Sequence, residues 1–471
     1  GNSEAAKLRQ LNNNLLNLHG QLIAADASKG AALRSQASAV IAERFAALQT
    51  MIQNDPMLAL QFAFDADLLA SMRESFPASA AQFETQGSWT GPVDYLIFDD
   101  PTLMNHRVDL NMKVAGEVLK LHFKDKEPTW FKCSDILTVS GVKAGVEVAA
   151  ADGQVSGSVA PAGSCTTLGD QKTLVILVNL IDDPATTTVV EPASSLPAGA
   201  TKSMLEKIYF TGDAANGNSR SLNGYWQDAS YGKASASGVV VGPVNIVGIT
   251  CDQYYTIRDR AIAAANAADP TLDLLQFNRI AIIFPGSGCG WAGLGNLGCS
   301  SIGTPDGTIQ ASTVWNVATY MQSINQGIQL ASHEGGHNLT LHHASTRYFT
   351  NATTGAAEPL GPYNNSNIGG THNEYGDIYS AMGSWNLGHY AAPHKAQIGW
   401  LAGSNIQTIE SNGSFTIQPY ENITTNPQVL KVRRGTGNSA WLWMEFRQSI
   451  GLYDSALSSA SRTGALIHHS D

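Results

Sequence analysis

The run His333-Glu334-Gly335-Gly336-His337-Asn338-Leu339-Thr340-Leu341-His342-His343 decides the fold of this chain. Positions four residues apart lie on one face of an α-helix, so His333 and His337 can bind one Zn²⁺ together. Glu334 follows the first histidine and stays beside the open coordination position. This HExxH pattern is typical of zinc hydrolases, in which the carboxylate serves as general base. His343 would supply the third ligand after the helix has ended.

A second motif lies downstream of the zinc-binding pattern. The run Tyr375-Gly376-Asp377-Ile378-Tyr379-Ser380-Ala381-Met382-Gly383 ends in a methionine followed by glycine. A methionine of this kind usually belongs to an ordinary core, and HExxH alone can arise by chance on a solvated helix. Because Met382 follows an extended zinc motif, it resembles the Met-turn of metzincin peptidases, whose methionine packs beneath the metal without binding it.

Further segments extend the resemblance to the gametolysin-type (M11-type) metzincin peptidases. Downstream they are Asn386-Leu387-Gly388-His389-Tyr390 and Gly399-Trp400-Leu401. Upstream they are Ser221-Leu222-Asn223-Gly224-Tyr225-Trp226, Ser230-Tyr231-Gly232-Lys233 and Gly288-Cys289-Gly290-Trp291-Ala292-Gly293-Leu294-Gly295. The resemblance covers residues 165–450 and implies an α+β fold, with a metzincin-type zincin catalytic domain made of a twisted mixed sheet and an active-site helix. It also implies one catalytic Zn²⁺, peptidase activity and a secreted location.

Two positions depart from the family pattern. Thr340 stands where the family has a glycine whose positive φ ends the helix, and a β-branched residue adopts that conformation only at a cost. Either the turn is built differently, or Asn338 takes the unusual dihedral angles. The adjacent His342 could then compete with His343 for the metal. Ser384 stands where some metzincins carry a tyrosine that helps to hold the oxyanion, so no tyrosine is assigned there.

Composition limits the classes of partner. A chain of 471 residues suggests about three domains, and a hydrophobic content of 43% is ample for packed cores. The formal net charge of -11 argues against nucleic acid or an anionic membrane surface as partner. No apolar run reaches the roughly 18 residues that a membrane helix needs, so we expect no membrane span.

The cysteines of the chain are Cys133, Cys165, Cys251, Cys289 and Cys299. None of them forms a closely spaced pair such as CxxC, so disulfide bonds made in an oxidising compartment are expected instead of a zinc–thiolate cluster. Cys289 and Cys299 flank a glycine-rich loop and could bridge each other; alternatively, Cys251 could pair with Cys289. Two disulfide bonds among the four cysteines after residue 160 would leave Cys133 without a disulfide partner.

Periodicity and composition divide the chain into regions. Leucines recur at helical spacing from Leu8 to Leu22, whereas alternating and β-branched residues dominate from Val93 onward. The predicted regions are a helical part at 1–90, a β-rich part with a linker at 91–160, a catalytic domain at 165–402 and a small β region at 403–471. The end at His469-Ser470-Asp471 comes shortly after the apolar run Ala465-Leu466-Ile467, and from this a truncation is expected.

The predicted catalytic domain contains two segments with the composition of buried strands, Thr173–Leu180 and Ile280–Phe284. Thr313-Val314-Trp315 is predicted to be the edge strand beside the cleft. A protein or peptide substrate would dock there in extended form, because an edge strand offers unpaired backbone groups. The wall of the S1′ pocket is expected just after Met382, near Ser384, Trp385 and Asn386.

The first two regions together are interpreted as a propeptide that inhibits the enzyme within the same molecule. A ligand in the fourth zinc position would keep a secreted endopeptidase inactive before export. Cys133 is the candidate, because a thiolate binds zinc well and cysteine parity leaves this residue over. Its surroundings, Phe131-Lys132-Cys133-Ser134-Asp135, differ from the cysteine-switch motif of matrix metalloproteinases. A buried structural cysteine is the alternative, and Asp99 or Asp100 could take the inhibitory role instead.

The leading hypothesis is a secreted, latent zinc endopeptidase. Zinc would lower the pKa of a bound water, and Glu334 would accept its proton and later deliver it to the leaving amine. The alternatives are a non-enzymatic binding protein or adhesin on a degenerate metzincin scaffold, which Thr340 favours, and another zinc hydrolase such as an amidase. Calcium is a further candidate cofactor without EF-hand spacing. Calcium is considered because of an oxygen-rich stretch that comprises Asn364, Asn365, Asn367, Asn373, Glu374 and Asp377.

Overall fold

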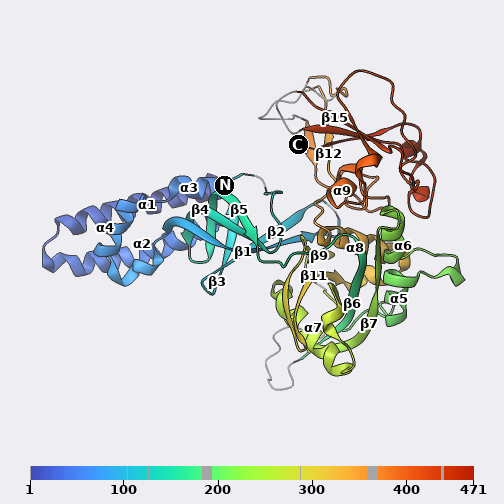
Figure 1. The fold of residues 1–471 in the computed structure, drawn as a ribbon. Helices are drawn as coiled ribbons and strands as arrows, with labels where there is room; N and C mark the ends of the chain where they lie inside the picture. Colours follow the sequence, from blue (N-terminus) through green and yellow to red (C-terminus); the bar gives the residue numbers. More distant parts are fainter. Residues whose placement is uncertain are drawn as a thin grey trace. The chain divides into compact units, whose positions relative to one another are not determined.

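The structure, a computed structural model, divides into two compact units (Figure 1). One consists of Gly1–Leu96 and Val108–Pro161, and the other of Ile97–Arg107 and Ala162–Asp471. Ile97–Arg107 therefore belongs to the second unit although the chain on both sides of it belongs to the first. The residues described are 2–102, 104–125, 127–182, 194–286, 288–351, 353–358, 370–435 and 440–470. Within these ranges no helix is long and apolar enough to cross a membrane.

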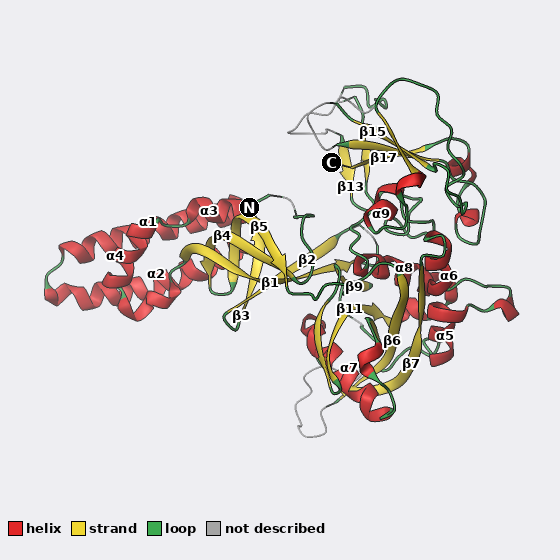
Figure 2. Ribbon diagram, in the orientation of Figure 1, coloured by secondary structure: helices red, strands yellow, loops and turns green. Residues whose placement is uncertain are grey.

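The first unit opens with helices (Figure 2). They are α1 (Asn2–Ala24), α2 (Ala27–Asn54), α3 (Pro56–Phe62), α4 (Ala66–Ser75) and the 3₁₀ turn η1 (Pro77–Gln82). The carboxylates of Asp26, Asp55 and Asp65 cap α2, α3 and α4 by accepting a hydrogen bond from a backbone N–H of the first turn. Leu8 and Leu15, on the predicted leucine stripe of α1, are fully buried.

Strands complete the first unit, and two of them, β1 and β2, extend into the segment Ile97–Arg107 of the second unit. They are β1 (Thr85–Asp99), β2 (His106–Val114), β3 (Glu117–Phe123), β4 (Asp135–Ala144) and β5 (Glu147–Ser158), in the spatial order β2-β3-β5-β4-β1. A buried ion pair connects the helices to the start of β1. Each terminal nitrogen of Arg44 donates to one oxygen of Glu84 over 2.6 Å, and the two side chains are 1% and 0% exposed. Loss of either partner would leave an uncompensated buried charge.

A mixed sheet forms the frame of the second unit. Its strands are β6 (Gly169–Ile181), β7 (Ala234–Val247), β8 (Arg279–Phe284), β9 (Gly293–Asn296), β10 (Ser300–Thr304) and β11 (Gly307–Val317). The order is β9-β11-β8-β6-β7, and β10 pairs with β11. β6, β7, β8 and β11 run parallel, whereas β9 is antiparallel to β11. The predicted strands Thr173–Leu180 and Ile280–Phe284 lie in β6 and β8, and every residue of β8 is buried, as parallel strands require.

The prediction that Thr313-Val314-Trp315 is an edge strand is wrong. This segment lies in β11, which is paired with β8 on one side and with β9 on the other. Val314 lies opposite Gly295, and Trp315 lies opposite Leu294. Glycine is depleted in strands, so the composition of Gly293–Asn296 gave no sign that it would add a strand outside β11.

Helices of the second unit pack around a core of aromatic side chains. The elements are α5 (Lys202–Glu206), η2 (Lys207–Thr211), η3 (Ala214–Asn216), α6 (Leu222–Ala229), η4 (Cys251–Gln253), α7 (Tyr254–Ala268), η5 (Leu274–Gln276), η6 (Ala318–Met321), α8 (Ile324–Asn338) and α9 (Ala392–Gln397). Trp226 and Tyr390 are almost fully buried in this core. The indole of Trp226 donates to the Tyr390 hydroxyl, which donates to the backbone oxygen of Ser332 on α8. The two motif segments that contain Trp226 and Tyr390, one before and one after the zinc pattern, thus pack against helix α8, and the Tyr390 hydroxyl is hydrogen-bonded to it.

The last part of the chain adds small sheets and further turns to the second unit. They are β12 (Thr346–Tyr348), β13 (Thr371–Asn373), η7 (Gly403–Asn405), β14 (Ile406–Ile409), β15 (Val429–Arg433), β16 (Trp441–Glu445), η8 (Asp454–Ala456), η9 (Ser459–Arg462) and β17 (Leu466–Ser470). β14-β15-β16-β17 form one sheet. Buried Arg447 donates to Glu445 and Asp454 and to the backbone oxygen of Tyr379. These contacts connect the region predicted as a separate β domain at 403–471 to the chain that follows the zinc motif.

Two disulfide bonds lie in the second unit, Cys165–Cys299 and Cys251–Cys289. Of the two partners considered for Cys289, the structure therefore has Cys251. Cys133 is a buried thiol of the first unit, and its sulfur exchanges hydrogen bonds with the backbone N–H and oxygen of Tyr95. This position corresponds to the structural alternative for Cys133.

Candidate metal centre and active site

Helix α8 carries the first two histidines of the zinc motif. Each donates from Nδ1 to a backbone oxygen, His333 to Ala381 over 2.8 Å and His337 to Leu341 over 2.7 Å. Because Nδ1 is engaged in this way, each Nε2 presents its lone pair to the site. Among the described residues, both buried Nε2 atoms lack a hydrogen-bond partner. Two such atoms facing one point are suited to a metal ion.

The turn after α8 brings in the third histidine. Thr340 itself adopts the left-handed conformation, with φ of 77°, so neither a rebuilt turn nor Asn338 replaces the glycine of the family pattern. The backbone N–H of Leu341 donates to the oxygen of Gly336, which closes the turn. His343, rather than His342, then points its Nε2 into the cluster.

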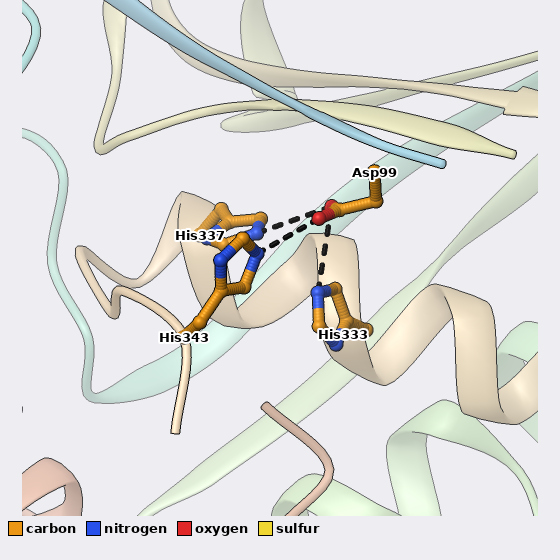
Figure 3. Close-up of side chains that lie close together, drawn as sticks. All are labelled: Asp99, His333, His337 and His343. Atoms are coloured by element: carbon orange, nitrogen blue, oxygen red, sulfur yellow. Dashed lines mark hydrogen bonds and ion pairs between the residues drawn. The ribbon is translucent and has the colours of Figure 1, made fainter. Parts of the chain in front are cut away.

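The three imidazoles converge on the carboxylate of Asp99 (Figure 3). Asp99 Oδ2 lies 3.4 Å from Nε2 of His333 and 3.3 Å from Nε2 of His337. Asp99 Oδ1 lies 2.8 Å from Nε2 of His343. Asp99 is the last residue of β1, and its backbone oxygen accepts from the N–H of Ala292, just before β9. The carboxylate is therefore a fourth side chain that could hold a cation together with the three imidazoles.

Asp99 is one of the two acidic residues that the sequence offered as an inhibitory ligand. The other, Asp100, instead caps its own turn by accepting from the N–H groups of Thr102 and Asn105. Cys133, the first candidate, is not among the residues that the structure brings to the histidines, and its sulfur contacts Tyr95. Cysteine parity indicated a thiol outside the disulfide bonds but carried no information about where the fold would place it.

Charges in the cluster shift one another strongly. Burial opposes ionisation of Asp99, but attraction from His333 and His343 outweighs burial and holds the pKa of Asp99 well below its usual range. Burial lowers the pKa of His337 to about 4, so its imidazole is neutral. Burial also disfavours a charge on His343, yet Asp99 and Glu374 outweigh it and raise the pKa of His343 to about 9. A proton and a metal cation compete for the same lone pair, so these carboxylates also attract a cation.

The donor set fits zinc. Neutral imidazoles are common zinc ligands, and three protein ligands with an open fourth position are typical of catalytic zinc sites. His343 Nδ1 lies 3.0 Å from Oε1 of Glu374, which orients this imidazole as the backbone oxygens orient the other two. The sequence had placed Glu374 in a candidate calcium stretch. Of that stretch, Asn364, Asn365 and Asn367 lie outside the described residues, and the carboxylate of Asp377 accepts from the N–H of Tyr379.

Glu334 is fully buried next to this donor set. Neither of its carboxylate oxygens has a hydrogen-bond partner among the described residues. A β-carbon at Gly293 would overlap the carboxylate, so the backbone of β9 passes directly against it. Burial and the charge of Asp99 raise the pKa of Glu334 well above its ordinary value. A carboxyl group in this setting is suited to accept and return a proton.

Met382, the methionine predicted to form a Met-turn, packs against α8. Its side chain is fully buried, and its backbone oxygen accepts from the N–H of Ala344, next to His343. A β-carbon on Gly336 would overlap the Met382 sulfur, and one on Gly335 would lie 2.9 Å from the ring of Trp226. These glycines therefore allow close packing beneath and beside the helix.

Little empty space remains beside Asp99. A cavity of about 10 Å³ remains beside His333 and Asp99, walled in part by Ser384 and Trp385, the predicted S1′ wall. This is scarcely enough for one water molecule. The indole of Trp385 donates to the backbone oxygen of Pro101 over 3.3 Å. A larger cavity of about 590 Å³ is lined in part by His343.

Sequence reasoning did not assign a role to Tyr375. Its hydroxyl donates to Asp99 Oδ1 over 2.6 Å, and its ring centroid lies 4.2 Å from that of His343. The residue stands in the quoted Met-turn run, but nothing in its spacing indicated that it would reach the histidines.

Comparison with known proteins identifies a family for this chain. A search of curated proteins gave no match. The family model described as Gametolysin peptidase M11 matches residues 185–469, which is more than half of the chain and includes the histidine cluster and Met382. On the strength of this match, the chain belongs to the gametolysin M11 family of metallopeptidases.

Proposed function

We propose that this chain is a zinc-dependent endopeptidase of the metzincin type. The observation that carries the proposal is the convergence of three imidazole Nε2 atoms beside a buried carboxyl group, Glu334. The substrate class, protein or peptide, follows from the M11 family.

Each catalytic task has a residue in this arrangement. Bound by His333, His337 and His343, zinc would supply a Lewis acid and lower the pKa of a coordinated water. Glu334 would take the proton of the attacking water and pass it to the leaving amine nitrogen, acting first as base and then as acid. Its burial next to β9 keeps it away from bulk water until substrate arrives.

We also propose that the chain as given is a latent proenzyme, with Asp99 as the inhibitory ligand. A buried carboxylate within 2.8–3.4 Å of all three Nε2 atoms would compete with water for the metal. Pro101 would exclude substrate from the S1′ side through its contact with Trp385. Residues up to Pro161 would thus form a propeptide, and its inserted segment Ile97–Arg107 would carry the inhibition.

Secretion is part of the proposal. Two disulfide bonds connect distant parts of the second unit, and their cysteines have sequence separations of 134 and 38. Such bonds persist in oxidising compartments and are rare in the cytosol.

The test is hydrolysis of denatured casein by the full chain, before and after limited proteolysis, with and without a zinc chelator. We expect chelator-sensitive cleavage that increases after proteolysis. Glu334→Gln should remove it while zinc content stays near one ion per chain. Glu410→Gln, an exposed matched change, should have no effect.

A non-enzymatic binding protein on the same scaffold is the competing function. If zinc binds but the processed chain hydrolyses no casein, or if Glu334→Gln leaves hydrolysis at full speed, the endopeptidase proposal is wrong and the binding protein is favoured.

A further inference from the structure

The two oxygens of the Asp99 carboxylate meet different partners. Oδ2 faces the two histidines of helix α8, at 3.4 Å from His333 Nε2 and 3.3 Å from His337 Nε2. Oδ1 is held by His343 Nε2 over 2.8 Å and by the hydroxyl of Tyr375 over 2.6 Å. The short contacts of the carboxylate are therefore both on Oδ1, where the Tyr375 hydroxyl is a neutral donor, and Oδ2 has only the longer contacts with two imidazoles.

The phenol of Tyr375 is fixed in place. The side chain is 3% exposed, and its ring packs against His343 and, at 6.1 Å between centroids, against His333. The preceding residue, Glu374, is paired with His343. Two residues on, the N–H of Asp377 donates to the oxygen of Ala344. Because these contacts come from residues after Pro161, the hydroxyl would keep its position relative to the imidazoles when Asp99 departs.

Asp99 resembles a reaction intermediate in one respect. When water adds to a peptide carbonyl, the tetrahedral carbon carries two oxygens, as a carboxylate carbon does. Donors aimed at the position of a developing oxyanion stabilise it more than they stabilise the neutral carbonyl, and removing one such donor typically slows turnover roughly 100- to 1,000-fold. The partners of Asp99 thus mark the places where the two oxygens of the intermediate would be held.

We propose that Tyr375 is a catalytic residue that donates a hydrogen bond to the oxyanion of the tetrahedral intermediate after Asp99 has left the site. This proposal rests on the proposed endopeptidase function. The phenol keeps its proton throughout. The water oxygen forms the new C–O bond, its proton goes to Glu334 and then to the amine nitrogen, and the electron pair of the breaking C–N bond stays on that nitrogen. Tyr375 would fill the role for which Ser384 is unsuited.

A simpler role for Tyr375 is to hold Asp99 in the latent form alone. Both roles predict that Tyr375→Phe weakens latency, so the processed enzyme has to decide between them. Phenylalanine preserves the ring that packs against His343 and removes only the donor. Tyr348→Phe is the matched control, because Tyr348 is 55% exposed.

The experiment compares the parent, Tyr375→Phe and Tyr348→Phe after limited proteolysis of the full chain. For Tyr375→Phe we expect kcat to fall roughly 100- to 1,000-fold with KM within about twofold, as for the loss of a transition-state contact. The Ki of a phosphinic peptide, whose phosphorus carries two oxygens, should rise by a similar factor. Zinc content and thermal midpoint should match the parent, which shows that the variant is folded.

Two outcomes would overturn the inference, and they are distinguishable. If processed Tyr375→Phe keeps the parent's kcat and phosphinic-peptide Ki while the full chain loses latency, Tyr375 only holds Asp99. If the processed parent itself shows no chelator-sensitive hydrolysis, the proposed function fails, and the inference about Tyr375 fails with it.

Discussion

The sulfur of Met382 lies so close to the α-carbon of Gly336 that a β-carbon on this glycine would overlap it. Helix α8 can therefore lie directly on Met382 only because position 336 has no side chain. A glycine inside a helix normally costs about 1 kcal/mol relative to alanine, so helix propensity is here subordinate to packing.

Gly336→Ala should consequently destabilise the chain, by about 1–3 kcal/mol from overpacking. Urea unfolding followed by tryptophan fluorescence measures this. Gly20→Ala is the matched control, because Gly20 lies within helix α1 with no atom near its missing β-carbon, and it should gain up to about 1 kcal/mol. Equal stability of Gly336→Ala and the parent would show that the Met-turn can shift freely.

Asp99→Ala should activate the full chain without proteolysis. Loss of a charged contact worth about 1.5–3 kcal/mol corresponds to roughly 10- to 100-fold more chelator-sensitive hydrolysis. Asp100→Ala and Cys133→Ser should stay as latent as the parent, because Asp100 caps its own turn and the Cys133 thiol contacts Tyr95. Activation by Cys133→Ser but not by Asp99→Ala would assign latency to the thiol after all.

Glu374→Ala should weaken zinc binding 10- to 100-fold, in the range typical for loss of a carboxylate that orients a metal-binding histidine. Competition with a fluorescent chelator gives the Kd. Glu358→Ala changes an exposed carboxylate hydrogen-bonded to Asn351 and should leave the Kd unchanged. A parent-like Kd for Glu374→Ala would mean that His343 needs no orienting partner.

Stability should depend on pH through Glu445. Burial opposes its charge, but Arg447 and His468 outweigh burial and hold the pKa of Glu445 below its ordinary value. The stabilisation is therefore present above the unfolded-state pKa of about 4.3 and is lost as pH falls through the folded pKa. Glu445→Gln should cost about 3–5 kcal/mol at pH 7, and less at pH 3. Urea unfolding at both pH values, with Glu410→Gln as exposed control, tests this. A constant difference would contradict it.

Thr340→Gly should stabilise the chain. A β-branched residue at φ of 77° stores about 1–3 kcal/mol of strain, whereas glycine adopts this conformation freely. Glycine also gives the unfolded chain more conformational entropy, which lowers the free energy of unfolding by up to about 1 kcal/mol. A net gain of about 1 kcal/mol is expected, measured as a higher thermal midpoint. Thr340→Ala keeps a β-carbon and should recover less. If glycine lowers the midpoint, the threonine side chain contributes more than its strain costs.

Local patterns predicted the part of the site that lies close together in sequence. Helical spacing places His333 and His337 on one face, and a short turn is enough to bring His343 to them. The turn itself was harder to foresee, because Thr340 takes a dihedral angle that glycine would normally supply. Periodicity also predicted the order of helical and β-rich regions along the chain, and it predicted strands β6 and β8.

These local patterns could not predict contacts between residues that lie far apart in the sequence. Asp99 contacts His343, which lies 244 positions later in the sequence. Whether Asp99 or Asp100 meets the histidines depends on where strand β1 ends. Strand β9 is rich in glycine, so its position beside Thr313-Val314-Trp315 could not be read from residue preferences. Tyr375 carried no signal apart from its place near Met382.

The bond between Cys165 and Cys299 determines what a single cut in the chain can release. A break between Pro161 and Cys165 separates Asp99 and everything before it from the peptidase, with no covalent link left among the described cysteines. A break a few residues later, beyond Cys165, leaves the same piece tethered through sulfur. Maturation by the first route would need a protease alone, whereas the second would also need a reductant before the inhibitory acid could diffuse away.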